Sequence, residues 1–122
     1  MLLAVGEHVL GPLEEREIRL STGFAGGIGS THREICGAVS AGVMIIGGRL
    51  GRSAPGVDDT ACQELTARYI RQFQDRFNTL NCGELRREDY GSQGAEPCSV
   101  LVERASRLLL DCIAELENDQ AA

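Results

Sequence analysis

The run of residues from Ile35 to Ile46 contains no charged side chain, and this feature constrains the fold more than any other in the chain. A helix formed by such a run has no polar face to offer to water, so we expect it to lie inside the protein. Small residues one helical turn apart, such as Ala38 and Gly42, let another backbone approach this helix closely. The sequence therefore predicts an all-α fold, a bundle of about five helices around one central, apolar, small-residue-rich helix.

A glycine-rich segment, Gly23 to Gly29, precedes this run. Thr31 and Glu34 match the S/T-x-x-E capping box, which predicts that the central helix begins at about His32. That start places Cys36 in or just past the first turn. The glycine-rich segment is either a backbone cradle for an anion or, in the interpretation that we favour, a flexible turn that lets helices pack closely.

The remaining helices are predicted from apolar spacing and from capping residues. They are an N-terminal helix that ends at Gly11-Pro12, a second helix from Pro12 to about Leu20, a long helix capped by Asp58 or Asp59, a short helical turn opened by Asn81, and a last helix with Pro97 at its first position. We expect residues 118–122 to fray. No strand, repeat or domain boundary is predicted, so residues 1–122 are expected to form a single helical domain.

Composition excludes several classes of function. The 122 residues carry a net charge of −6, which argues against a protein that binds nucleic acid. All 12 basic residues are arginine, so the chain has neither a Walker A lysine nor a Schiff-base lysine. The longest uncharged run, Ile35 to Gly48, is shorter than the roughly 18 to 20 residues of a membrane span. Without a signal-peptide pattern at its start, the chain is expected to be cytoplasmic, with no insertion into a membrane.

The five cysteines are the candidate functional residues. In the cytoplasm they should be mostly reduced, because that compartment keeps thiols from forming stapling disulfides. The predicted caps place Cys36, Cys82 and Cys98 in or near the first turn of a helix, where the helix dipole lowers a thiol pKa and favours the nucleophilic thiolate. No C-x-x-C pair is present, so a site must assemble from distant segments. The alternative is that these are ordinary buried cysteines.

The other two cysteines are weaker candidates. Cys112 follows Cys98 on the same predicted helix at a distance of about 21 Å, calculated with roughly 1.5 Å per residue. A disulfide needs Cα atoms within about 7 Å, so these two cysteines cannot be joined. We interpret Cys112 as a core residue and Cys62 as a weak extra candidate.

Three segments, which together extend over most of the chain, resemble one known family. They read CGAVSAGVMIIG preceded by GFAGGIG, then FQDRFNTLNCGELR, then CSVLVERASRLLL. They resemble a bacterial family of redox-active proteins named for a CGAxxG motif and four characteristic cysteines. Three of the four are matched here, by Cys36, Cys82 and Cys98, and the position of the family's first cysteine aligns before Met1.

The resemblance implies that these three cysteines carry thiol–disulfide exchange or electron transfer, with a redox partner protein, or that they ligate a metal or an iron–sulfur cluster. A cluster would need a ligand besides the three cysteines, for which His32 and His8 are candidates. The cofactor is therefore either an iron–sulfur cluster or none.

Three interpretations stay open. In the first, the protein is a redox protein with Cys36 as the nucleophile. In the second, the same cysteines carry a metal or an iron–sulfur cluster. In the third, the cysteines belong to the core of a structural module, and the small-residue helix mediates homo-oligomerisation. The sequence shows no catalytic carboxylate pair or Ser-His-Asp set, and whether the protein is an enzyme stays open.

Overall fold

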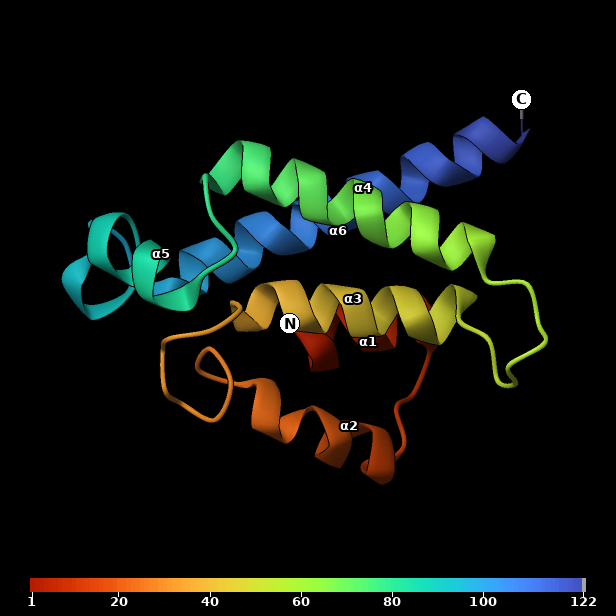
Figure 1. Ribbon diagram of the computed structural model, residues 1–122, viewed down its shortest axis with the longest axis horizontal. Helices are drawn as coiled ribbons and strands as arrows, with labels where there is room; N and C mark the ends of the chain where they lie inside the picture. The colour runs from red at the N-terminus through yellow and green to blue at the C-terminus, as the bar shows by residue number, and fades with distance from the viewer. Residues whose placement is uncertain (122) are drawn as a thin grey trace.

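The structure is a computed structural model that describes residues 1–121. The described residues form helices and loops with no named strand, which confirms the all-α prediction (Figure 1). There are six α-helices where about five were predicted. They are α1 (Leu2–Leu10), α2 (Glu15–Ser21), α3 (Gly37–Leu50), α4 (Thr60–Phe77), α5 (Cys82–Glu88) and α6 (Cys98–Ala121), with short 3-10 helices η1 (Thr22–Phe24) and η2 (Gly91–Gln93).

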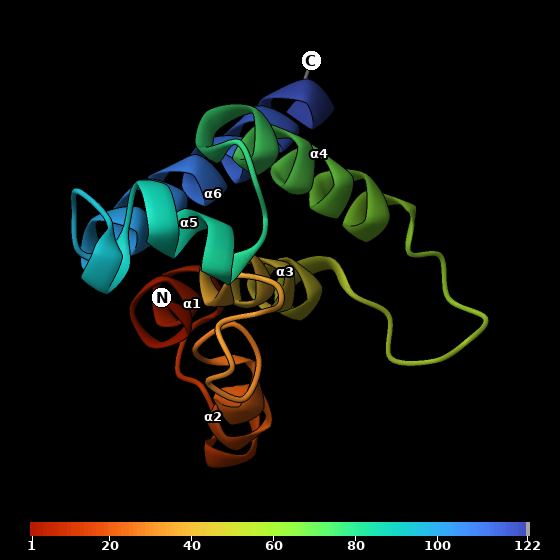
Figure 2. The same cartoon turned by 60° about the vertical axis from the view of Figure 1, so that its left-hand side comes forward.

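Helix α3 packs against α1, α4 and α6. Figures 1 and 2 show α2 on one side of α3, and α4 with α6 on the other. The small residues of α3 allow this packing. The hydroxyl of Tyr69 on α4 donates to the carbonyl oxygen of Ala38 at 2.8 Å, and its ring lies where a side chain on Gly42 would have to be. The predicted close approach of another helix to α3 is thus present.

Aromatic residues of α4 continue the core toward α5. The rings of Phe73 and Phe77 are 4.6 Å apart between centroids, and the ring of Phe77 lies 6.3 Å from that of Tyr90. Cys112 of α6 is fully buried, which confirms its interpretation as a core residue, whereas Cys62 is half-buried near the start of α4. Within residues 1–121, no helix is both long enough and apolar enough to cross a membrane.

The predicted start of the central helix at His32 is wrong, because α3 begins at Gly37. Thr31 does not cap it. The hydroxyl of Thr31 instead donates to the carbonyl oxygens of Gly27 and Ile28, at 3.1 and 3.0 Å. The preceding residues explain the difference. All residues from Gly26 to Ser30 have φ between 58° and 63°, and a left-handed backbone of this kind cannot continue into a right-handed helix.

The glycine-rich segment therefore contains a defined left-handed turn. Left-handed backbone is tolerated by glycine, which supplies three of the five residues from Gly26 to Ser30. Main-chain hydrogen bonds hold the turn together, including one from the amide of Gly29 to the carbonyl of Gly23 at 2.7 Å and one from His32 to Gly26 at 2.9 Å. We name residues 26–32 the left-handed turn.

Other helix boundaries are close to the predicted ones. The second helix begins at Glu15 rather than Pro12, because Glu14 and Glu17 form a capping box there. Asn81 caps α5 as predicted, and its Oδ1 accepts from the amide of Glu84 at 3.1 Å. The last helix begins at Cys98, one residue after Pro97.

The far end of α6 also differs from the prediction. Residues 118–121 are helical rather than frayed, and Asp119 forms an ion pair with Arg68 of α4 at 3.1 Å. Residue 122, also included in that prediction, lies outside the described residues.

Candidate functional site

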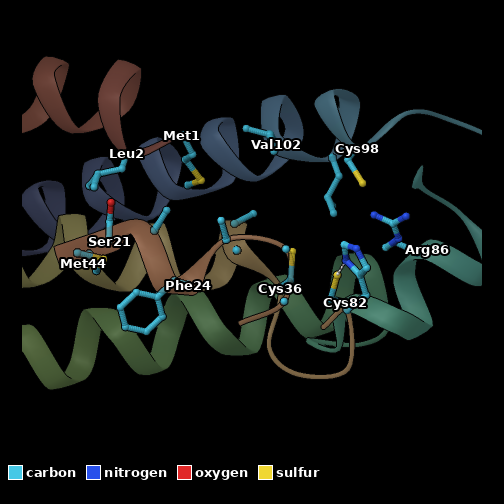
Figure 3. Close-up of a pocket in the computed structure, with 18 residues that line it drawn as sticks. Met1, Leu2, Ser21, Phe24, Cys36, Met44, Cys82, Arg86, Cys98 and Val102 are labelled. Atoms are coloured by element: carbon cyan, nitrogen blue, oxygen red, sulfur yellow. Dashed lines mark hydrogen bonds between the residues drawn. The ribbon is translucent and has the colours of Figure 1, made fainter. Parts of the chain in front are cut away.

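A cavity of about 400 Å³ lies where the N-terminus, the left-handed turn, α3, α5 and α6 meet. Cys36, Cys82 and Cys98 all line it, each from a different segment (Figure 3). Cys36 directly precedes α3, Cys82 is the first residue of α5 and Cys98 is the first residue of α6. The structure thus brings together all three cysteines singled out in the sequence, each at the start of a helix.

Backbone pairing holds two of these cysteines close together. Ile35 and Asn81 form an isolated antiparallel bridge, with hydrogen bonds from the amide of Cys36 to Leu80 and from the amide of Cys82 to Glu34, both 2.8 Å. Cys36 and Cys82 therefore lie diagonally across the paired segments. In a regular antiparallel pair, the Cα atoms of two residues in this relationship are roughly 7–8 Å apart. Disulfides need Cα atoms within about 7 Å, so the two thiols, which are free here, would have to move closer before they could be joined.

Asn81 fixes the position of this pairing. Its Nδ2 donates to the carbonyl oxygen of Arg33 at 2.8 Å, while its Oδ1 caps α5 through the amide of Glu84. The amide of Asn81 in turn donates to the hydroxyl of Thr79 at 3.1 Å. One side chain therefore links the segment before Cys36 to the helix that begins with Cys82.

The left-handed turn packs directly on Cys82. The backbone of Gly27 lies so close that a Cβ there would be 2.9 Å from the Sγ of Cys82, a separation that real Cβ atoms essentially never show. At the end of the turn, the Nδ1 of His32 lies 3.7 Å from the same sulfur. The sequence suggested His32 only as a metal ligand and did not indicate Gly27. The signal that could have found Gly27 is the high glycine content of the segment.

Burial dominates the electrostatics of the two recessed thiols. Cys36 is 7% exposed and Cys82 is 9% exposed. Burial raises the pKa of Cys36, and hydrogen bonds with the backbone of Ala38 and Val39 at the start of α3 oppose this only in part. Burial also raises the pKa of Cys82, against the opposing effect of the Arg86 guanidinium. The predicted lowering of the thiol pKa at a helix start is therefore wrong for both residues.

The cavity has two chemically different ends. Figure 3 shows Cys82, Cys98 and Arg86 at one end, and Leu2 and Met44 at the other. His32 lines the thiol end beside Cys82, whereas His8, the other suggested ligand, does not line this cavity. The sequence did not predict the apolar end, because its residues come from segments that only the tertiary fold brings together.

A metal ion requires several donor side chains that converge on one point. Within residues 1–121, no group of three or more histidine, cysteine, aspartate or glutamate side chains is arranged so that it could hold a metal ion. The three cysteines and His32 share a cavity without forming such a group. As they stand, these residues do not form a site for a single metal ion.

The fold and the cavity define a class of protein, an all-helical protein in which cysteines at helix starts converge on one apolar cavity. Residues 1–112 match the family described as "Putative redox-active protein (C_GCAxxG_C_C)", and the chain belongs to that family. No curated protein and no solved structure shows a significant match to the chain. Which cysteines of the chain correspond to those in the family's motif stays a prediction.

Proposed function

We propose that the protein is a thiol-based redox protein in which Cys36 and Cys82 cycle between a dithiol and a disulfide. The observation that carries this proposal is the backbone pairing around Ile35 and Asn81. This pairing holds the two cysteines diagonally opposite each other in the wall of one cavity. Membership of a family described as redox-active supports the same conclusion.

The contact with His32 favours Cys82 as the attacking thiol, rather than Cys36 as the sequence suggested. A thiol whose pKa is raised by burial is mostly protonated at neutral pH, so attack requires a base. The imidazole of His32 is 3.7 Å from the Cys82 sulfur, and an imidazole is suited to move a proton near neutral pH. Cys36, on the adjacent paired segment, is then the resolving thiol.

The exchange proceeds in two displacement steps. His32 accepts the proton of Cys82, and the thiolate attacks one sulfur of a substrate disulfide. An S–S bond to Cys82 forms, the substrate S–S bond breaks, and the departing thiolate takes the proton from His32. Cys36 then attacks the Cys82 sulfur while its proton passes to the departing second substrate sulfur, which forms the Cys36–Cys82 disulfide, breaks the mixed disulfide and releases the second substrate thiol. Two electrons pass from the protein to the substrate, and an external dithiol returns them.

Cys98 supplies a third thiol at the same cavity and is more exposed than the other two. We assign it to exchange with an external dithiol, because it is the cysteine of the cavity that a larger reductant reaches most readily. It attacks the Cys36–Cys82 disulfide at Cys82, and the resulting Cys82–Cys98 disulfide lies closer to the surface.

Equilibration of the protein in defined mixtures of reduced and oxidised dithiothreitol tests the proposal. Thiols are trapped by alkylation and the disulfides are mapped by mass spectrometry. We expect the loss of two thiols per chain with a Cys36–Cys82 link in the wild type and in Cys62→Ser, which lies outside the cavity. Cys36→Ser should form a Cys82–Cys98 link in its place, and Cys82→Ser should form no link within the chain. Thiols that stay fully reduced at every potential, or that form only links between chains, would contradict it.

The other interpretations have less support. A carrier of a single metal ion needs a donor group that residues 1–121 do not arrange. A self-association role for the small residues of α3 conflicts with their contacts inside the chain, since Gly42 lies under Tyr69 and Gly48 under Leu10.

A further inference from the structure

The cavity that holds the thiols is apolar over most of its wall. Its lining away from the sulfurs consists largely of the aliphatic, thioether and aromatic side chains of Met1, Leu2, Phe24, Met44, Leu101 and Val102. A volume of about 400 Å³ falls in the range of pockets that enclose small organic ligands. The reactive sulfurs are thus at one end of a space large enough to enclose most of a small molecule.

Charge distinguishes this cavity from the rest of the protein. The chain has 18 aspartate and glutamate residues, yet none of them lines the cavity. Apart from the thiols, the ionisable side chains in the lining are His32 and Arg86, both at the thiol end. A charged molecule would have to lose much of its hydration to lie along the apolar wall, whereas an uncharged one would not.

The depth of the thiols limits the size of the substrate. Cys36 and Cys82 are only 7% and 9% exposed, and both line the cavity. Displacement at a disulfide needs the attacking sulfur to approach along the S–S bond. A disulfide on the surface of a folded protein cannot be brought into line with a sulfur recessed in this way, whereas a disulfide in a small molecule can enter.

We infer that the cavity is a binding site for an uncharged, apolar, low-molecular-weight disulfide, whose organic body lies against the apolar end while its S–S bond meets Cys82. The inference rests on the proposed thiol–disulfide exchange and names its substrate class. The bonds made and broken are those of the exchange described above, with the small disulfide as the species reduced.

Two chromogenic aromatic disulfides test this inference on the wild-type protein. Dithiodipyridine is uncharged at neutral pH, whereas dithiobis-nitrobenzoate carries two carboxylates. For each reagent, the rate of modification of Cys82 is divided by the rate of the same reagent with free N-acetylcysteine. Mass spectrometry shows that the modified residue is Cys82. Because a carboxylate would have to lose hydration against the apolar wall, the normalised rate should be at least about 10-fold higher for dithiodipyridine. Equal normalised rates, or faster reaction of the charged reagent, would overturn the inference.

A variant that fills the cavity provides a second test. Ala41 lines the cavity from α3, so Ala41→Leu should slow the reaction of Cys82 with dithiodipyridine by about 10-fold, by removing the space that one ring occupies. Ala67→Leu, on the exposed face of α4, is the matched control and should leave the rate unchanged. An unchanged rate in Ala41→Leu would count against the inference. Thermal unfolding checks that both variants fold, and if Ala41→Leu does not, the comparison of the two reagents on the wild type decides.

These experiments separate the inference from the proposed function. If Cys82 reacts readily with both reagents and Cys36 then resolves the mixed disulfide, but neither charge nor Ala41→Leu has an effect, only the substrate class is wrong. If Cys82 reacts with neither reagent, the proposed exchange itself is wrong, and the inference fails with it.

Discussion

The Nδ1 atom of His32 lies 3.7 Å from the Sγ atom of Cys82, although 50 residues separate the two in the chain. The contact depends on the left-handed turn, which ends at His32 and packs Gly27 on the same cysteine. Strained backbone of this kind costs free energy and is often found at functional sites. In the proposed function, the glycine-rich segment brings an imidazole to a recessed thiol.

Replacement of His32 by glutamine tests whether the imidazole activates Cys82. We expect alkylation of Cys82 by iodoacetamide at neutral pH to slow by at least about 10-fold, as is typical for the loss of a positioned base. The other groups that act on Cys82 are Arg86 on its own helix and Cys98 on α6, and the substitution leaves both in place. Since burial raises the pKa of Cys82, the remaining rate should increase as the pH rises. His8→Gln is the control, and an unchanged rate in His32→Gln would contradict the role of His32.

Gly27 should tolerate substitution less well than its neighbour Gly29. Both have left-handed φ, 63° and 58°, which costs an alanine about 1–2 kcal/mol. A Cβ on Gly27 also collides with Cys82, while one on Gly29 meets nothing within 4 Å. Urea unfolding followed by circular dichroism should show that Gly27→Ala loses about 2–4 kcal/mol of stability and Gly29→Ala only about 1–2 kcal/mol. Similar losses would show that the turn does not press on Cys82.

Two glycines of α3 should respond in opposite directions to alanine. Gly42→Ala places a methyl group against the ring of Tyr69, which is fully buried and hydrogen-bonded to Ala38, so stability should fall by at least about 1 kcal/mol. Gly47→Ala on the same helix meets nothing within 4 Å and should gain about 0.5–1 kcal/mol. Thermal or urea unfolding measures both, and a stabilised Gly42→Ala would show that α4 does not approach α3 as closely as described.

Cys112 should make stability depend on pH in the alkaline range. Burial raises the pKa of its thiol to about 11 from the ordinary value of 9.0. The unfolded chain therefore loses this proton at a lower pH than the folded chain. The stability that the neutral thiol contributes is complete below pH 9.0 and is lost as the pH rises toward about 11. The free energy of unfolding, measured against pH, should fall more steeply for the wild type than for Cys112→Ala. Cys62→Ala serves as the control and should retain the wild-type slope.

Local sequence signals predicted the elements whose causes are themselves local. Asn81 caps α5 through a hydrogen bond to a residue three positions away, and the uncharged run from Ile35 to Ile46 reads directly as a helix with little solvent exposure. Thr31 shows the limit of such signals. The capping box predicted from Thr31 does not form, because the residues just before it have left-handed backbone. A search for capping residues does not take this backbone conformation into account.

The sequence identified the cysteines of the candidate site but not how they are arranged in space. Cys36, Cys82 and Cys98 were identified from their places near predicted helix starts, and local sequence set the starts at Cys82 and Cys98 but not the one after Cys36. The bridge between Ile35 and Asn81 and the contact of His32 with Cys82 join distant segments, so no spacing in the sequence indicates them. The thiol pKa directions were mispredicted for the same reason, since burial is a property of the tertiary fold.

The recessed position of Cys82 also affects what happens after a substrate has reacted. Small charged peptide thiols in the surrounding solution would have to lose hydration along the apolar wall to reach this sulfur, which is 9% exposed. A mixed disulfide at Cys82 would therefore be resolved by its neighbour Cys36 before the ambient thiol pool could intercept it. The oxidation state of this pair would then respond directly to its own substrate, and to the reductants of its surroundings only through Cys98.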